Sequence, residues 1–431
     1  EDPYPGFDIK NVTKTGNHQR YKFFVTPLEI IILKMDGKKE FTKKESDKIF
    51  PTIKFASEKK ETQKVKSNYK GFELETPNYA IVNNTKYRGK RFVQGYDTET
   101  QDFIFLVEAN LNDVDYIEED SFELHYIMEQ FCENMETELD SAAGEYTVEN
   151  NIPAYYSYTI LDSVKNTKLN LSTQLIGERF YLLGYLGDKE KSKDFFSHVD
   201  ITTFSDYEQK FEEQQDTNLF YMVHAPEKNP MADYGGSPFY RQKKDEKAYL
   251  GYSKSQVYGI NSNEQVTVQF EKFHDWAVYE NIDSLWEGKK RRIEGLGFEL
   301  VEENIYKEDS LYFYEGLATR ENSQRAVKFK YIQKNGSLYL LKTLIHQDLP
   351  LSPFIDTFYQ TFTPLDTAIG MSPLVNKSDL FLTAIENQDS ILLSSSKFIE
   401  LDTKDFETAK KLFLEKEFDE DWEFLKDELL D

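Results

Sequence analysis

The chain has 431 residues, enough for two to four domains at roughly 100–200 residues each. A hydrophobic content of 39 % and an aromatic content of 15 % exclude a fully disordered chain, and 33 Phe and 28 Tyr residues predict aromatic-rich cores. Lys and Arg number 52 against 77 Asp and Glu, so the formal net charge is −25, which argues against nucleic acid or an anionic membrane as the main partner.

Cysteine content and apolar runs narrow the class of protein further. Cys132 is the single cysteine, which excludes an intrachain disulfide, and its apolar neighbours predict a buried structural thiol rather than a nucleophile. No apolar run approaches the roughly 18 residues of a membrane span. The first residues, EDPYPG, lack an initiator Met, as expected of a processed or trimmed product. We therefore expect a periplasmic or cell-envelope location, although a trimmed end explains the missing Met equally well.

Residues 1–55 predict a strand-and-helix segment. The stretch KFFVTPLEIIILKMDGKK reads as strands, and FTKKESDKIFPTIKF reads as a helix that ends near Phe55. This order is typical of the end of the domains described next, so we interpret it as the tail of a truncated third copy. The opening hairpin of the first domain is the alternative.

A first domain is expected over residues 68–204. Near its start, Phe72, Leu74 and Thr76 alternate with polar residues before Pro77, as in a strand with one buried face. Asp120 and Ser121 are typical N-cap residues. An amphipathic helix is predicted after them, because apolar residues recur at helical spacing at Leu124, Ile127, Met128, Phe131, Met135 and Leu139.

Residues 205–246 read as a connecting segment. It holds Glu- and Gln-rich stretches, the apolar strand NLFYMVHAP and a Pro- and Gly-rich loop. Within that loop, MADYGGSPFYRQ brings together Tyr234, Tyr240 and Arg241, a combination that suits recognition of a peptide or a glycan. Packing of the loop between domains explains the same residues equally well.

A second domain is expected over residues 247–362, because the segments 153–204 and 311–362 align without a gap at an offset of 158 residues. The alignment places Tyr156 on Tyr314, Leu186 on Leu344, Phe196 on Phe354 and Phe204 on Phe362. At an offset of 163, Asp120 and Ser121 lie over Asp283 and Ser284, which predicts a second central helix that ends near Gly295 and Gly297.

The second copy closes on another predicted helix. Ser352 stands at the cap position and Pro353 at the first helical position, where its missing N–H costs nothing. Phe354, Phe358 and Phe362 then share one face, which we expect to seal the sheet. From residue 377 to residue 431 the pattern is helical and acidic, with no strand evident, so we expect an all-helical C-terminal segment.

The recurring order of elements resembles the PsbP/Mog1-like fold, an α+β sandwich that also occurs in small bacterial domains. The residues that carry the resemblance are Phe72 to Pro77, Asp120 to Leu139 and Arg179 to Phe204, and in the second copy Asp283 to Gly297 and Ser337 to Phe362. The resemblance implies two tandem antiparallel-sheet domains with flanking helices. It also implies a binding or assembly module without chemistry of its own.

The whole chain also resembles, faintly, the extra domains attached to some bacterial TraB/GumN-type proteins. Those proteins carry a catalytic-type domain with paired Gly-x-x-His motifs, and this chain has none, because His18 follows Gly16 one residue too soon. That resemblance implies the alternative of an accessory region of a larger enzyme whose catalytic domain lies outside this chain.

No chemistry-bearing motif is present in the sequence. A phosphate loop, a Gly-x-Ser-x-Gly elbow, a His-Glu-x-x-His pair and a cysteine pair are all missing. His125 and Glu129 share a helix face, but two ligands do not complete a zinc site. The acidic run at 110–120 lacks the glycine and ligand rhythm of a calcium loop, and the basic run at 289–292 reads as a solvated helix face.

The sequence therefore predicts a non-catalytic binding or assembly protein without a cofactor or metal. The expected partner is a protein and not nucleic acid, and the sequence does not define an oligomeric state. Tyr234, Tyr240 and Arg241 are the candidate binding residues.

Overall fold

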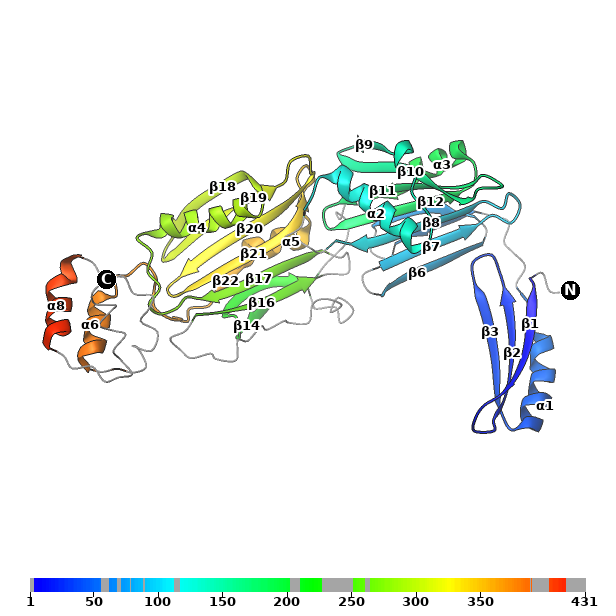
Figure 1. The fold of residues 1–431 in the computed structure, drawn as a ribbon, viewed down its shortest axis with the longest axis horizontal. Helices are drawn as coiled ribbons and strands as arrows, with labels where there is room; N and C mark the ends of the chain where they lie inside the picture. Colours follow the sequence, from blue (N-terminus) through cyan, green and yellow to red (C-terminus); the bar gives the residue numbers. More distant parts are fainter. Residues whose placement is uncertain are drawn as a thin grey trace.

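The fold is taken from a computed structural model of residues 1–431. It describes the chain apart from residues 1–3, 56–61, 68–70, 78, 88–89, 112–116, 202–209, 227–250, 260–263, 388, 390–402 and 416–431. The described residues form several antiparallel sheets with few helices, so the protein is of mixed α/β class. Figure 1 shows two large sheets in the middle, a small sheet at the N-terminal end and helices at the C-terminal end.

The first large sheet has seven antiparallel strands in the order β6-β7-β8-β12-β11-β10-β9. The alternation seen in the sequence places one set of side chains on each face of this sheet. The strands are β6 (Tyr79–Tyr87), β7 (Lys90–Tyr96), β8 (Phe103–Asn110), β9 (Glu145–Glu149), β10 (Ile152–Asp162), β11 (Thr167–Ile176) and β12 (Arg179–Leu186).

The second large sheet repeats this order, and the described residues supply no counterpart of β6. Its six strands run β16-β17-β21-β20-β19-β18, so each lies where β7, β8, β12, β11, β10 or β9 lies in the first sheet. The strands are β16 (Tyr252–Gly259), β17 (Gln265–Lys272), β18 (Glu299–Glu308), β19 (Leu311–Thr319), β20 (Arg325–Lys334) and β21 (Ser337–His346).

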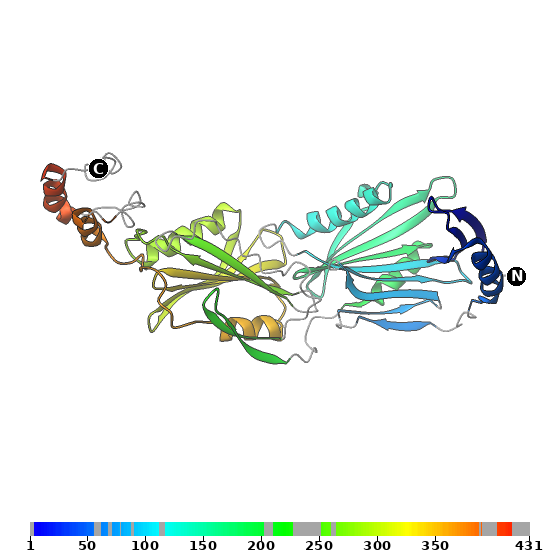
Figure 2. The ribbon, with the colours of Figure 1, turned by 90° about the horizontal axis from the view of Figure 1, so that it is seen from below.

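Each large sheet carries one helix on either face. In the first sheet, α2 (Asp120–Asn134) buries Met128 against Leu182, whereas α3 (Lys189–Ser197) buries Phe196 in the cluster that contains Leu183. Leu182 and Leu183 are neighbours in one strand, so their side chains point to opposite faces. In the second sheet α4 (Ile282–Gly295) and α5 (Pro353–Thr361) lie on opposite faces in the same way (Figure 2).

Two small sheets complete the pattern. One has the order β13-β5-β4 and the other the order β14-β15-β22. The short strand after α3, β13, pairs with β5, and the short strand after α5, β22, pairs with β15, so each pairs with a hairpin from earlier in the chain. Their strands are β4 (Gln63–Lys66), β5 (Phe72–Thr76), β13 (Asp200–Ile201), β14 (Phe211–Asp216), β15 (Tyr221–Pro226) and β22 (Thr363–Pro364). The apolar strand expected in the connecting segment is thus β15, which forms a hairpin with β14 and lies against α5.

Residues 6–52 form a separate small sheet with one helix. The sheet has the order β1-β2-β3, and α1 follows β3 as α3 follows β12. Its elements are β1 (Gly6–Val12), β2 (His18–Val25), β3 (Ile30–Gly37), α1 (Lys39–Ile49) and the 3₁₀ turn η1 (Phe50–Thr52). Three strands and a closing helix are the elements expected of a truncated tail, which stays a proposal for the chain's domain organisation.

The described part of the C-terminal segment is helical. It contains α6 (Ser378–Asn387), the 3₁₀ turn η4 (Thr403–Asp405) and α8 (Phe406–Glu415), and Trp276 packs into the core that α6 and α8 share. Much of 377–431 lies outside the described residues, so an all-helical segment remains a prediction. No helix within the described ranges has the length and apolar character needed to cross a membrane.

The gapless alignment of the two copies is wrong by one residue in one strand. β11 and β12 follow the predicted offset, since Leu169 pairs with Leu186 as Val327 pairs with Leu344. In β10, a bulge between Ile160 and Asp162 adds one residue. A one-residue slip moves a side chain to the other face of a sheet, so the counterpart of Tyr314 is Tyr155 and not Tyr156.

One further aligned pair and two N-cap predictions are also wrong. The loop before α5 is longer than the loop before α3, so Phe196 and Phe354 are not equivalent, while Phe204 lies outside the described residues. The cap of α4 is Asn281, whose side chain forms a capping box with Ser284. Asp120 is not the cap of α2, because its carboxylate is bonded to the second sheet's β19–β20 loop.

Candidate functional site

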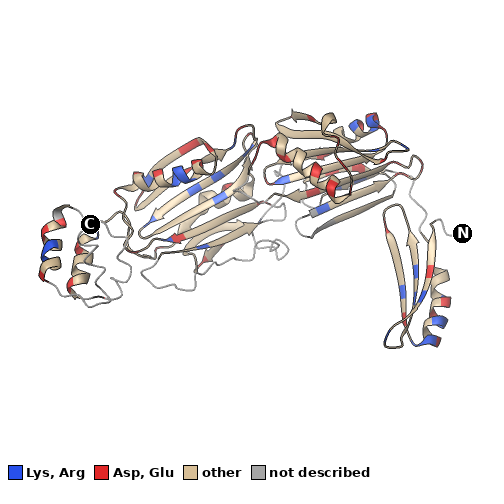
Figure 3. Ribbon diagram, in the orientation of Figure 1, with Lys and Arg blue, Asp and Glu red and all other residues tan. Residues whose placement is uncertain are grey.

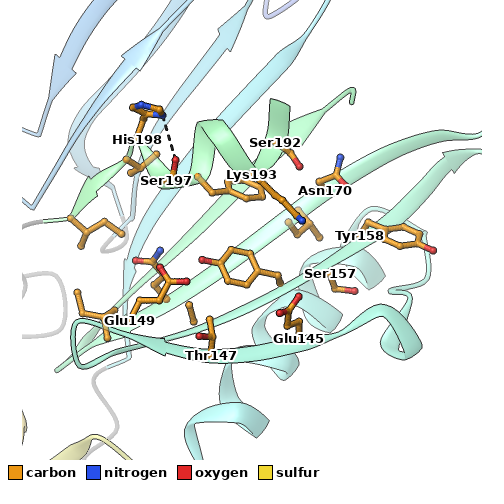
Figure 4. A pocket seen from close by; sticks show the side chains of 18 of the residues that line it. Glu145, Thr147, Glu149, Ser157, Tyr158, Asn170, Ser192, Lys193, Ser197 and His198 are labelled. Atoms are coloured by element: carbon orange, nitrogen blue, oxygen red, sulfur yellow. Dashed lines mark hydrogen bonds between the residues drawn. The ribbon is translucent and has the colours of Figure 1, made fainter. Parts of the chain in front are cut away.

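A cavity of about 660 Å³ opens on the α3 face of the first large sheet. Its volume lies within the range of small-ligand sites, which is roughly 300–1,000 Å³. Strands β9, β10 and β11 form the floor, and α3 with the residues after it forms the wall. The lining includes Glu145, Glu149, Ile152, Ala154, Tyr156, Tyr158, Asn170, Gln174, Lys189, Ser192, Lys193, Phe196, Ser197 and His198 (Figure 4).

The same place in the second sheet is filled. The first sheet pairs Ala154 with Gln174, and at the equivalent register the second sheet pairs Phe313 with Ile332. Phe313 and Ile332 are buried in the core beneath α5. Tyr359 on α5 adds a ring there, and its hydroxyl donates a hydrogen bond to the Lys328 carbonyl oxygen at 2.8 Å. At these two floor positions the first sheet has Ala154 and Gln174, which leave the cavity open. The second sheet has Phe313 and Ile332, which fill the same space.

Opposite charges stand on the two sides of the cavity. Lys189 and Lys193 belong to α3, whereas Glu145 and Glu149 belong to the edge strand β9 (Figure 4). This arrangement suits a ligand that carries both charges or many dipoles. A uniformly anionic polymer would meet the two carboxylates as well as the two amines.

Amide and hydroxyl groups supply directional contacts on the floor. The Asn170 side chain donates to the Gly187 carbonyl oxygen at 3.3 Å, which fixes the orientation of its amide. Gln174 makes no side-chain hydrogen bond within the described part of the chain, so its donor and acceptor are available to a ligand. The Tyr156 hydroxyl is protonated at neutral pH and can donate, and burial raises its pKa further from that range.

Ser197 and His198 lie at one corner of the cavity, and with the neighbouring Asp194 they do not form a catalytic triad. The Asp194 carbonyl oxygen lies 2.7 Å from His198 Nδ1, and Ser197 Oγ lies 3.4 Å from the same nitrogen. A general base must use one ring nitrogen for the nucleophile and the other for the acid. Both partners share Nδ1 here, so the group is a polar helix end and not a nucleophile–base set.

A buried charge cluster lies where the first large sheet meets the small β13-β5-β4 sheet. Arg91 donates to Glu108 at 2.9 Å, and Arg179 lies 3.6 Å from the second oxygen of the same carboxylate. Tyr181 donates to the Gly71 carbonyl oxygen at 3.1 Å, and burial raises the pKa of this phenol strongly. Since Gly71 precedes β5, the cluster ties the small sheet to the large one and is structural.

The two large sheets meet through α2. The Asp120 carboxylate accepts hydrogen bonds from Ser323 Oγ at 2.9 Å and from the Gln324 backbone N–H at 2.7 Å, and Glu123 forms an ion pair with Arg325. Burial raises the pKa of both carboxyls despite these partners. The sequence did not reveal this contact, because Asp is common both at helix N-caps and as a hydrogen-bond acceptor between domains, and Asp120 was interpreted as a cap.

A second pair of acids is buried at this junction. Glu178 in the β11–β12 turn and Glu264 before β17 line a cavity of about 30 Å³ together with His346. Burial raises the pKa of Glu264 to about 7. Burial and the negative charge of Glu264 raise the pKa of Glu178 well above its usual range, and burial lowers the pKa of His346. The space is too small for a ligand, so this is a junction contact.

The residues singled out in the sequence have different fates. Tyr234, Tyr240 and Arg241 lie outside the described residues, so their role stays a prediction. His125 bonds Ser141 at 3.2 Å, and the described ranges contain no group of three or more metal-ligand side chains. The basic run is the blue stretch of α4 in Figure 3. In it, Lys289 pairs with Glu271 at 3.2 Å and Lys290 with Glu303 at 2.8 Å.

Sequence reasoning missed the cavity because its lining residues are spread over β9, β10, β11, α3 and the residues that flank them. None of them belongs to a motif. The one usable signal was the contrast between Ala154 and Gln174 in one copy and Phe313 and Ile332 in the other, and the bulge in β10 hid it.

No family model and no curated protein matches the chain. Solved structures similar to it include the PsbP protein of Synechocystis, with 11 % identity, a TM-score of 0.26 and coverage of 35 % of this chain and 99 % of the other. The Ran-binding protein Mog1p of Saccharomyces cerevisiae matches with 8 % identity, a TM-score of 0.24 and coverage of 37 % and 97 %.

A third match is the immunity protein TplEi of the T6SS from Pseudomonas aeruginosa, with 9 % identity, a TM-score of 0.14 and coverage of 73 % and 98 %. The expected resemblance to TraB/GumN-type proteins has no support in these matches. What the chain does must therefore be argued from its own residues.

Proposed function

We propose that this chain is a non-catalytic binding protein, built from PsbP/Mog1-like units in tandem, that holds a polypeptide segment in the cavity beside α3. The observation that carries the proposal is the cavity itself. It is open in the first sheet and filled at the equivalent place of the second, so the opening is not a consequence of the fold.

The lining favours a peptide over other ligands. Asn170 and Gln174 present amide groups that match a peptide backbone, and Tyr156, Ile152 and Phe196 present apolar surface for side chains. β9 is the outer strand of its sheet in the described part of the chain, so an extended peptide has a backbone edge to pair with. The net charge of −25 and the carboxylates on β9 disfavour nucleic acid as the occupant.

The test fills the cavity by substitution, with the residues that occupy the equivalent positions of the second sheet. A phage-displayed library of random peptides is selected on the full chain, and enriched peptides are measured against the double variant Ala154→Phe/Gln174→Ile. We expect affinity to fall at least about tenfold, because the new side chains occupy the floor. Val164→Ser, in the exposed β10–β11 turn, is the matched control and should bind as the wild type does.

Two outcomes oppose the proposal. One is that no peptide is enriched on the wild-type chain beyond the level reached on the double variant. The other is that enriched peptides bind both proteins equally. Circular dichroism spectra and melting curves of the double variant establish that the fold is retained.

A further inference from the structure

The outer strand β9 has a regular pattern of side chains that indicates what a strand beside it must carry. Its sequence is Glu-Tyr-Thr-Val-Glu, and all five residues pair with β10 without a bulge. Successive side chains of a strand point to opposite faces of the sheet. Glu145, Thr147 and Glu149 face the cavity (Figure 4), so Tyr146 and Val148 face the side on which α2 lies.

The side of β9 away from the cavity is apolar and exposed. Tyr146 is 40 % exposed and Val148 is 45 % exposed. Burial and the carboxylates of Asp120 and Glu119 raise the pKa of Tyr146, which places its ring beside the start of α2. Apolar residues of a neighbouring strand, directly opposite Tyr146 and Val148, would cover both side chains.

The cavity side of β9 carries two carboxylates. Glu145 and Glu149 are exposed and form no ion pair within the described ranges. Burial and the charges of both carboxylates raise the pKa of Tyr156, so the two lie near one hydroxyl group. A strand beside β9 would therefore meet negative charge at two positions four residues apart.

The lysines of α3 are too distant to offset this charge. Lys189 and Lys193 belong to a helix that packs over β11 and β12. A strand outside β9 would lie about 14 Å from β11, at about 4.8 Å for each strand. Exposed charges are largely screened beyond roughly 8–10 Å at physiological salt. Such a strand would therefore respond to the carboxylates of β9 and not to the two amines.

The equivalent edge of the second sheet is protected against such pairing. β18 has a bulge between Leu300 and Glu302, and Lys307 stands on the same strand. Bulges and lysines are two features by which edge strands avoid pairing with other chains. The Glu303 carboxylate of β18 is already ion-paired with Lys290 at 2.8 Å. β9 has none of these features, so its accessible edge belongs to the first sheet and is not a consequence of the fold.

We propose that the segment held beside α3 is an extended strand that pairs with β9 and carries Lys or Arg at two positions four residues apart, with apolar residues at the second and fourth positions. This inference rests on the proposed function and specifies the chemistry of its ligand. The basic side chains lie opposite Glu145 and Glu149, and the apolar ones lie opposite Tyr146 and Val148. The pattern is the same in both directions, so it holds for a parallel or an antiparallel pair.

The central residue of the segment connects this pairing to the cavity. It faces Thr147, which pairs with Ala154 of β10, and Ala154 pairs in turn with Gln174 of β11. These three residues form one row across the cavity floor. A long side chain at the central position leans along this row into the cavity, which is the space that Ala154→Phe/Gln174→Ile fills.

The probes are peptides enriched on the full chain from the phage-displayed random library whose binding is lost in the double variant that fills the cavity. They should share two basic residues four apart. Glu145→Lys/Glu149→Lys should lower their affinity at least about tenfold, because two attractions become repulsions. Peptides with Glu in place of the two basic residues should prefer this variant to the wild type, which also shows that the variant is folded.

A matched control has the same change in net charge at another place. Glu129→Lys/Glu133→Lys, on the exposed side of α2, should bind the enriched peptides as the wild type does. An equal loss of affinity in this control means that net charge, and not the edge of β9, attracts the peptide, and it overturns the inference.

The other contrary results separate this inference from the function on which it rests. Cavity-dependent peptides that lack the two basic residues overturn the inference alone. Peptides that bind Glu145→Lys/Glu149→Lys as tightly as the wild type do the same. Enrichment of no cavity-dependent peptide overturns both the inference and the proposed function.

Discussion

Lys193 is the cavity residue whose charge is easiest to test. It stands on α3 opposite the carboxylates of β9, and its nearest acidic neighbour, Glu190, is 3.9 Å away. Lys193→Ala should weaken peptide binding about tenfold at low salt and less at high salt, because an exposed charge is screened. Isothermal titration at two salt concentrations measures this. Lys191→Ala on the same helix, whose amine pairs with Asp102 at 2.9 Å, is the control and should leave affinity unchanged.

Glu108 is the residue on which the buried cluster depends. It pairs with both Arg91 and Arg179, all three side chains being almost fully buried. Glu108→Gln removes the charge that compensates the two guanidinium groups, so the free energy of unfolding should fall by about 3 kcal/mol. Urea unfolding followed by circular dichroism measures the loss. Glu129→Gln on the exposed side of α2 should have no effect, and an unchanged Glu108→Gln protein would contradict the structural role given to the cluster.

At the scale of elements, the two central helices begin in different ways. α4 begins with a capping box between Asn281 and Ser284, whereas α2 has no side-chain cap. Asn281→Ala should therefore cost about 1 kcal/mol through the lost cap. Tryptophan fluorescence reports it directly, since Trp286 lies on α4. Asp120→Ala should act differently, by weakening the contact with Ser323 of the second sheet. Comparing the two variants therefore distinguishes the contribution of a helix cap from that of a contact between the sheets.

Elements were more predictable than their registers. The alternation of Leu169, Leu171 and Thr173, and the Tyr-Leu-Leu strands, specified β11 and β12 and their counterparts, because one buried face imposes a period of two. The bulge at Ile160 and Asp162 could not be predicted, because an inserted residue leaves the composition of a strand unchanged. The bulge changes which residues of β10 correspond to those of β19, and so places Tyr156 and not Tyr155 in the cavity.

At the scale of the whole molecule, the junction between the sheets should respond to pH. The pKa of Glu264 is about 7 in the folded protein against an ordinary value of 4.5. A raised carboxyl pKa contributes stability that is complete below the unfolded-state value and is lost as pH rises through the folded-state value. The free energy of unfolding should thus fall between pH 5 and pH 8 by about 3 kcal/mol for this group.

Glu264→Gln gives the matching control for that prediction. The amide cannot ionise, so the pH dependence of the urea midpoint, followed by tryptophan fluorescence, should flatten. Equal slopes in the wild type and the variant would show that Glu264 is not buried at the junction in its protonated form.

The order of the strands and helices around the two large sheets was predictable from the sequence repeat, but the contacts between the sheets were not. Asp120 bonds to Gln324, and Glu178 lies beside His346, and each pair joins parts of the chain that are far apart in the sequence. The cavity was also not predictable from the repeat, since it depends on Ala154 and Gln174 standing where the second sheet has Phe313 and Ile332.

Hydrogen exchange of the full chain with a selected peptide tests the central claim, that the first sheet's cavity holds a polypeptide segment. We expect slower exchange in residues 145–149 of β9 and 189–197 of α3 when the peptide is present, with no change in residues 299–308 of β18, the equivalent edge of the second sheet. Equal protection of both edges, or protection confined to other parts of the chain, would contradict it.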